Sequence, residues 1–291
     1  MRQIDPVDGV ARATWLDGVA GGVRDATKKV LRPGTLKDAL HGVWLGHPLH
    51  PSLAQFAVGC FTSAALLDVT GDRQAATRLI RFGVLGSLPA AAAGLADYAE
   101  GHEEQQRVGV VHAAANSAAL GCYLVSLRLR ATGRRGGVLA GLLGFSLAAT
   151  GAALGGDLAF RWAAGPNHAA EVPHAGPGNW TDLGAVGDFV DGEPVRVSAG
   201  LIPVLVLLAD GDFFVLHDRC SHMAAPLHQG EFTEQDGARC VVCPWHSSVF
   251  RLMDGSIVRG PATAPQPVLD SRVLDGRLQA RVRPIPGVPA S

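Results

Sequence analysis

Residues 220–248 read CSHMAAPLHQGEFTEQDGARCVVCPWHSS and contain two short motifs with metal-ligating side chains. The first motif is C-x-H, with Cys220 and His222, and twenty residues later the second is C-x-x-H, with Cys243 and His246. Each motif supplies one thiol and one imidazole, so two loops are enough to build a centre with four ligands. We therefore predict a metal centre held by these four side chains.

Two kinds of metal centre use two thiolates and two imidazoles. In a [2Fe–2S] cluster, two imidazoles in place of two thiolates on one iron remove negative charge and raise the reduction potential. A zinc site of two Cys and two His uses the same ligand types. A zinc finger, however, carries its His pair on a short helix, whereas each His here follows a Cys within one short motif. The pattern favours the [2Fe–2S] cluster, and zinc is the alternative.

The sequence around the two motifs predicts a small all-β domain. From Trp180 onward, short runs of strand-forming residues alternate with turn dipeptides such as Asp210-Gly211 and Asp275-Gly276, which are typical of β-hairpins. The predicted strands are residues 194–198, 204–208, 213–217, 238–242, 256–258 and 268–273.

The two motifs, together with the segment GSIVRGPA at 255–262, resemble the Rieske [2Fe–2S] family over roughly residues 179–284. The resemblance implies that the two cysteines bind the buried iron and the two histidines the exposed iron. It also implies that Pro261 belongs to a third loop covering the cluster, and that the Ser248 hydroxyl donates a hydrogen bond to a cluster sulfur. These two residues are therefore candidates for tuning the reduction potential.

Three positions depart from the pattern of Rieske proteins in quinol-oxidising respiratory complexes. Those proteins have an additional Cys in each loop, and the two form a disulfide, whereas this chain has Ala225 and Trp245 at these places. A tyrosine that usually donates a second hydrogen bond is replaced by Phe250. The resemblance thus favours the ferredoxin and oxygenase branch, with an intermediate to low potential within the Rieske range.

The remaining candidates in this region are expected to be structural. Five cysteines, an odd number, do not suggest a disulfide framework, and we expect Cys240 to be a core residue. His228 follows the first loop, and we expect it to be a solvated loop residue, with a hydrogen bond to a nearby group as the alternative. We expect His217 to pack structurally.

Upstream of the β domain, four long stretches are rich in apolar residues. Residues 136–156 carry no charged side chain, and the other stretches are nearly as apolar, so each approaches the roughly 20 residues needed to cross a bilayer. A buried soluble helical bundle is the alternative. The predicted membrane helices are residues 51–69, 80–98, 108–128 and 137–158.

The chain is therefore predicted to be a multidomain, multi-pass protein of the cell membrane. An all-α four-helix transmembrane bundle precedes the all-β domain. The predicted parts are a soluble N-terminal arm at 1–40, the transmembrane domain at 41–162, a linker at 163–178 rich in Ala, Gly and Pro, and the Rieske domain at 179–285.

Two His-Pro pairs open the first predicted helix, in the segment GHPLHP at 46–51. In a four-helix topology, the start of the first helix and the start of the third lie on the same side of the membrane, so His47 and His50 lie on the same side as His112. Polar residues at membrane depth tend to be functional. One hypothesis is that a redox partner or a metal lies where His50 and His112 meet, with haem b and a quinone head group as candidates. The other is that these histidines are interfacial residues that satisfy helix ends. The other residues expected on this face are Asp97, His102, Asn116, Asp157 and His168.

Residues 41–160 resemble an uncharacterised family of bacterial four-helix membrane proteins that open with paired His-Pro motifs. In that family a polar residue ends the first helix, as Asp68 does here. The resemblance supports the topology and implies no activity.

Charge says little about partners and gives opposing signals about orientation. A net charge of −1 argues against a nucleic-acid partner. The loops at 70–81 and 128–136 carry seven Lys and Arg residues, including Arg135, whereas about four lie near the opposite helix ends. Because loops rich in Lys and Arg usually lie on the cytoplasmic side, this count would place both termini outside the cell. Because clusters are assembled in the cytoplasm and the arm at 1–37 is also basic, we expect a cytoplasmic Rieske domain.

The most direct functional hypothesis is a membrane-anchored one-electron carrier that exchanges electrons with a redox protein partner or a quinone. The alternative is a quinone- or haem-linked oxidoreductase subunit that uses the membrane histidines, and a redox sensor is a third. A Rieske oxygenase would need a further catalytic domain, and fewer than ten residues follow the β domain, so we do not expect a stand-alone enzyme.

Overall fold

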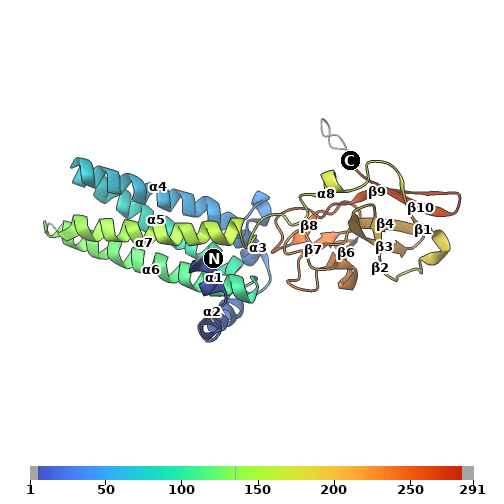
Figure 1. Cartoon of the computed structure of the whole chain (residues 1–291), viewed down its shortest axis with the longest axis horizontal. Helices are drawn as coiled ribbons and strands as arrows, with labels where there is room; N and C mark the ends of the chain where they lie inside the picture. The colour runs from blue at the N-terminus through green and yellow to red at the C-terminus, as the bar shows by residue number, and fades with distance from the viewer. Residues whose placement is uncertain (1–5, 135, 284–291) are drawn as a thin grey trace, which may run out of the picture. The chain divides into compact units, whose positions relative to one another are not determined.

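The computed structural model describes residues 6–134 and 136–283, which fold into two compact units (Figure 1). The first unit comprises the described residues up to Gly42 together with Pro48–Gly165. The second comprises Val43–His47 and the described residues from Pro166 onward. Arg135, the first five residues of the predicted arm and the last two of the predicted Rieske domain lie outside the described residues.

Four long helices form the body of the first unit, and among the described residues these four are long and apolar enough to cross a membrane. This confirms the prediction of a four-helix membrane domain. Each helix is longer than predicted, and the extension is largest at the charged first turns of α5 and α6, which begin at Arg73 and Glu103. The helices are α4 (Leu49–Thr70), α5 (Arg73–Tyr98), α6 (Glu103–Ala131) and α7 (Gly136–Phe160).

A tight connection between α4 and α5 shows how the sequence ends one helix and starts the next. Gly71 has a φ of +100°, and its amide donates to the carbonyl of Leu67 over 2.9 Å, which closes α4. The Asp72 carboxylate then accepts a hydrogen bond from the Ala75 amide over 3.0 Å and caps α5.

The helices are arranged around the bundle in chain order, since α4 packs on α5, α5 on α6, α6 on α7, and α7 on α4. Helices α4 and α6 therefore face each other across the diagonal and run in the same direction. Three contacts join them at an identical offset of 62 residues along the chain. From one end of the bundle to the other, these contacts are His50 with His112, Phe61 with Tyr123, and Asp68 with Arg130.

This offset marks an internal duplication of the helical hairpin. The segment Gly59-Cys60-Phe61 in α4 is matched by Gly121-Cys122-Tyr123 in α6, and Thr70-Gly71 by Thr132-Gly133. The stacked rings of Phe61 and Tyr123 have centroids 3.9 Å apart. A Cβ on Gly83 of α5 would lie 2.4 Å from Phe61, and one on Gly144 of α7 3.2 Å from Tyr123, so equivalent glycines make room for both rings.

The predicted N-terminal arm is helical and is held against this bundle by polar contacts. Arg107 of α6 donates to Asp17 and to the carbonyl of Ala11, and Lys37 donates to the buried Glu100 over 2.6 Å. The short helices are α1 (Pro6–Ala11), η1 (Thr14–Leu16), α2 (Asp17–Val30), α3 (Thr35–His41) and, in the second unit, η2 (Val43–Leu45).

The second unit is built from three antiparallel sheets, ordered β1-β10-β9, β2-β3-β4 and β5-β6-β7-β8, which confirms the predicted all-β fold. One buried core lies among β1–β4, β9 and β10, and another among β3, β4, β6 and β7. The strands are β1 (Thr181–Ala185), β2 (Val195–Ala199), β3 (Ile202–Ala209), β4 (Asp212–His217), β5 (Glu231–Gln235), β6 (Ala238–Val242), β7 (Val249–Arg251), β8 (Ile257–Arg259), β9 (Leu269–Leu274) and β10 (Arg277–Val282).

The stretch predicted as a linker, 163–178, is folded from Pro166 onward as part of the second unit. Ala169 and Val172 are buried in the first core of the β domain, and Val172 starts the short helix α8 (Val172–Ala175). The amide of Val282 in β10 donates to the carbonyl of Pro177 over 2.8 Å. Apolar residues within a stretch rich in Pro and Gly thus give it a place in the core.

Candidate metal centre

Two loops at the ends of neighbouring strands bring the four predicted ligands together. The C-x-H loop follows β4, and the C-x-x-H loop connects β6 to β7. Each loop closes on itself through backbone hydrogen bonds: the Cys220 amide donates to Ala225, and the Cys243 amide donates to Ser248. Sequence patterning predicted these loops, and the structure places both on the second core.

The two cysteines form the inner half of the site. Cys220 is completely buried and Cys243 is 2% exposed, and their thiols are within hydrogen-bonding distance of each other. That hydrogen bond is the largest cause that raises the pKa of Cys220 and lowers the pKa of Cys243 to about 7. Backbone amides of both loops also donate to the two sulfurs, so the loops favour thiolates.

The two histidines form the outer half. The rings of His222 and His246 meet edge to face, with centroids 5.0 Å apart, and both residues are partly exposed. Their Nδ1 atoms are buried and hydrogen-bond to no atom of the described residues, although each residue has other interactions. Two imidazole nitrogens thus lie beside each other at the edge of a pair of sulfurs.

This donor set fits a two-iron cluster. A pair of thiols and a pair of imidazoles can each serve one iron, with bridging sulfides between the irons. A structural zinc ion would need all four groups around one point. Within residues 6–134 and 136–283, no three His, Cys, Asp or Glu side chains are placed to hold a single ion. The paired arrangement therefore favours the cluster over the zinc alternative.

The predicted tuning residues lie in and against the third loop, between β8 and β9. Ser248 is fully buried, and its Oγ accepts a hydrogen bond from the Ala262 amide over 2.9 Å. That contact uses a lone pair and leaves the hydroxyl hydrogen to donate elsewhere. Pro261 is buried beside Ala262, and Phe250 is a fully buried core residue.

Gln266 is a residue of this site that sequence patterning missed. Its side chain is buried, accepts from the Ser221 amide over 2.9 Å, and donates to the carbonyls of His217 and Arg219. A single amide thus fixes the backbone on both sides of Cys220. Gly255 allows the approach, because a Cβ there would lie 1.8 Å from the Gln266 carbonyl oxygen.

Asp218 is a second missed residue, and it changes the interpretation of His228. The buried Asp218 carboxylate accepts hydrogen bonds from the His228 amide over 2.8 Å and from its Nδ1 over 2.9 Å. His228 is therefore held by a buried partner, as the alternative expectation had it, and not merely solvated. Arg196 lies 3.4 Å from the same carboxylate and balances its charge.

The other local expectations agree with the structure. The five cysteines, all among the described residues, are free thiols, and Cys240 is fully buried in β6. His217 is buried, and desolvation is the main cause that lowers its pKa. At the places of the absent disulfide, Ala225 is buried and Trp245 is 49% exposed beside His246, with ring centroids 6.4 Å apart.

The segment before the β domain also reaches a ligand loop. The backbone amide of His168 donates to the carbonyl of Ser221 over 2.9 Å, next to Cys220 and His222. This residue was expected on the membrane face of the helical domain, and in the structure it belongs to the second unit.

In the membrane unit, the structure brings His50 and His112 together, with ring centroids 6.2 Å apart. The other predicted residues of that face have different partners. Asp97 accepts from the buried His41 over 2.8 Å, and Asp157 accepts from the Trp162 indole over 3.1 Å. His102 precedes α6 as its N-cap, and His47 is exposed in the second unit.

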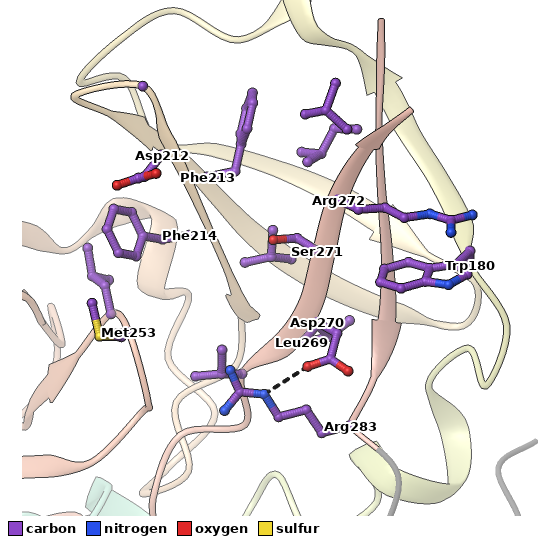
Figure 2. A pocket seen from close by; sticks show the side chains of 16 residues that line it. Trp180, Asp212, Phe213, Phe214, Met253, Leu269, Asp270, Ser271, Arg272 and Arg283 are labelled. Carbon is purple, nitrogen blue, oxygen red and sulfur yellow. Dashed lines mark hydrogen bonds and ion pairs between the residues drawn. The ribbon is translucent and has the colours of Figure 1, made fainter. Parts of the chain in front are cut away.

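A hollow of about 720 Å³ lies elsewhere on the β domain, between β4 and β9 (Figure 2). Trp180 and Arg272 flank it, with the Arg272 guanidinium 4.3 Å from the Trp180 ring centroid, and Arg283 donates to Asp270 at its rim. None of the four predicted ligands lines this hollow. The hollow is therefore separate from the candidate metal centre.

Two family models match the chain. The Rieske [2Fe-2S] domain matches residues 179–274, and the family described as a predicted membrane protein (DUF2231) matches residues 46–166. These matches confirm the predicted fusion. Because a Rieske domain binds a [2Fe–2S] cluster, they also confirm the predicted cofactor.

Several relatives of the C-terminal third are ferredoxins. The anthranilate 1,2-dioxygenase ferredoxin subunit of Burkholderia cepacia is 35% identical over 103 residues, which are 35% of this chain and 92% of that protein. The 3-phenylpropionate/cinnamic acid dioxygenase ferredoxin subunit of Escherichia coli (strain K12) is 37% identical over 81 residues, 28% of this chain and 72% of that protein. Among solved structures, Sphingomonas yanoikuyae B1 ferredoxin is 30% identical with a TM-score of 0.31, covering 36% of this chain and 100% of that one.

Proposed function

Because this chain belongs to the family of proteins that carry a Rieske [2Fe–2S] domain, we propose that it is a membrane-anchored one-electron carrier. The cluster is held by Cys220 and Cys243 on the inner iron and by His222 and His246 on the outer iron. The observation that carries this proposal is the buried thiol pair beside a partly exposed imidazole pair.

The protein positions its side chains for electron exchange rather than for substrate chemistry. When bound, the cluster takes up and releases one electron at a time. The buried cysteines keep water from the sulfur side, and the partly exposed histidines lie at the edge where a partner approaches. The exposed Pro244 and Trp245 lie directly beside that edge and offer a contact surface.

The partner is a redox protein. Ferredoxin subunits of dioxygenases are similar to the C-terminal third of this chain, so an oxygenase component or an equivalent electron acceptor is the partner we favour. Electron transfer from such a site requires close approach of the partner to the His222 and His246 edge. We accordingly propose a carrier or oxidoreductase subunit rather than a stand-alone enzyme.

We propose a cytoplasmic Rieske domain, because iron–sulfur clusters are assembled there and the N-terminal helices carry basic residues such as Lys28 and Lys29. Protease treatment of inverted and right-side-out vesicles tests this placement. Cleavage of the β domain in inverted vesicles alone is the expected result, and cleavage in right-side-out vesicles alone would contradict it.

Electron paramagnetic resonance of the full-length protein, with a redox titration, tests the carrier function. A reduced Rieske signal with a potential between about −150 and +300 mV is expected. Cys220→Ser, Cys243→Ser, His222→Ala and His246→Ala should each abolish this signal. Cys240→Ser is the matched control, because Cys240 is an equally buried thiol outside the two motifs, and it should keep the signal. A silent spectrum with stoichiometric zinc would overturn the proposal.

A further inference from the structure

The diagonal contact between His50 and His112 lies near one end of the helical bundle. His50 is the second residue of α4 and His112 the tenth of α6, and both side chains are partly buried. Ionisable residues within a membrane domain tend to be functional, and four-helix bundles commonly build cofactor sites from residues on facing helices.

Backbone carbonyls of the other two helices fix both rings. The Nδ1 of His50 is 2.8 Å from the carbonyl of Ala90 in α5, and the Nδ1 of His112 is 2.8 Å from the carbonyl of Gly151 in α7. A carbonyl only accepts, so Nδ1 carries the hydrogen in each neutral ring and Nε2 keeps its lone pair. Histidines that bind metals are held in this way by a second hydrogen bond.

The internal duplication makes the two histidines equivalent. A Cβ on Gly94 of α5 would lie 2.8 Å from the His50 ring, and a Cβ on Gly155 of α7 would lie 3.0 Å from the His112 ring. Each half of the bundle thus repeats one His, one carbonyl and one glycine. The Nε2 lone pairs of His50 and His112 are therefore related by the approximate two-fold symmetry of the bundle. A single ligand between the two rings can be shared by both.

We propose that His50 and His112 bind one transition-metal centre, each through Nε2. Two imidazoles on opposite sides of one metal, each bonded at about 2.0–2.1 Å, place their ring centroids roughly 6 Å apart. The observed separation of 6.2 Å agrees with this arrangement. The amide of Asn116 donates to the His112 carbonyl over 2.9 Å and also lies within hydrogen-bonding distance of Nε2 of His112, at 3.3 Å. The latter contact marks the accessible lone pair of Nε2, and a metal bound there would replace it.

A quinone fits these two rings less well. Imidazoles that hydrogen-bond to the two opposite carbonyls of one quinone would have centroids roughly 13 Å apart, about twice the observed separation. A quinone carbonyl also needs a donor, and both Nε2 atoms are acceptors in the neutral rings. Two lone pairs without a hydrogen suit a metal cation.

Haem iron and a free metal ion offer the same chemistry, and the experiment separates them. The full-length protein, purified in detergent, is first examined for haem by its absorption spectrum and by the pyridine haemochrome assay. Protein that lacks haem is then titrated with Co²⁺ and followed by visible absorption. We expect about one haem per chain in the first measurement or about one bound Co²⁺ per chain in the second.

His50→Ala and His112→Ala should lower that binding by at least about tenfold. His47→Ala removes an exposed imidazole three residues from His50 and should bind as the wild type does. Monodisperse elution in detergent and an unchanged far-ultraviolet circular dichroism spectrum, which the long helices dominate, report an intact membrane unit in each variant. If an alanine variant fails this check, His112→Gln replaces it, because its amide keeps a donor toward Gly151.

Two results would overturn the proposal: wild-type protein that binds neither haem nor Co²⁺, or pair variants that bind like the wild type. Neither result bears on the carrier function, since the site lies in the membrane unit and the cluster ligands lie in the β domain.

Discussion

Ser248 and Ala262 connect the second ligand loop to the third, because the Ser248 Oγ accepts a hydrogen bond from the Ala262 amide over 2.9 Å. Both residues are fully buried, so water does not compete for the serine hydroxyl. The amide occupies a lone pair of the oxygen and orients the hydroxyl hydrogen away from the third loop.

Ser248→Ala should lower the reduction potential of the cluster. A hydrogen bond to a cluster sulfur stabilises the reduced, more negative state of the cluster. If the substitution removes about 1.4 kcal/mol of that stabilisation, the one-electron reduction potential falls by roughly 60 mV. A redox titration followed by paramagnetic resonance measures the shift. Ser248→Thr keeps the hydroxyl and should stay near the wild-type value. An unchanged potential in Ser248→Ala would remove Ser248 from the tuning residues.

Gln266→Leu should destabilise the first ligand loop. It leaves the Ser221 amide and the carbonyls of His217 and Arg219 without their buried partner, at a cost of about 3 kcal/mol or more. Loss of visible cluster absorbance during denaturant unfolding measures this change. Gln229→Leu, at an exposed position, is the control and should change stability by less than about 0.5 kcal/mol. Equal midpoints for the two variants would contradict the role of Gln266.

Asp68→Leu should destabilise the membrane unit through Arg130. The two side chains form an ion pair with 1% and 7% exposure, and removal of one partner leaves a buried charge, at a cost of about 3–5 kcal/mol. Unfolding of the protein in detergent measures the loss. The double variant Asp68→Leu, Arg130→Leu should recover most of it, since no unpaired charge remains. A double variant less stable than Asp68→Leu would show that the pair does not act as a unit.

His217 should make the β domain less stable in mild acid. Desolvation lowers its pKa in the folded state below the ordinary value of 6.5, so the unfolded chain binds its proton first as the pH falls. The contribution to stability is complete above about pH 6.5 and is lost as pH falls toward the folded pKa, at up to about 1.4 kcal/mol per pH unit. Denaturant midpoints at several pH values measure this slope. His217→Gln should flatten the profile, and an equally steep profile in that variant would exclude His217 as the cause.

The sequence predicts those elements whose signal is local. Strand β6 (Ala238–Val242) has the predicted bounds, because it follows the Asp236-Gly237 turn and ends in two valines. Strands β1, β5, β7 and β10 were missed. Of these, β5 (Glu231–Gln235) is mostly polar, and β10 (Arg277–Val282) alternates polar with apolar residues. Both are stabilised by pairing with neighbouring strands, which a local pattern does not contain.

The same distinction holds for the two candidate sites. The spacing of Cys and His indicated the loops, whereas Gln266 and Asp218 act through contacts with distant backbone that no spacing reveals. The membrane histidines were expected to meet, and their equivalence was readable in the sequence from the repeated Gly-Cys-aromatic segments at 59–61 and 121–123. A search for internal repeats at intermediate periods finds that signal.

The folded segment from Pro166 onward also decides where the β domain can be separated from the rest of the chain. Ala169 and Val172 lie in the first core of that domain, and the carbonyl of Pro177 accepts a hydrogen bond from the Val282 amide over 2.8 Å. A fragment that begins at Trp180, just before the first strand, would lose two core side chains and a backbone partner of β10. A fragment that begins at Pro166 retains the complete core, and it is the form in which the two ligand loops keep their support without the helices.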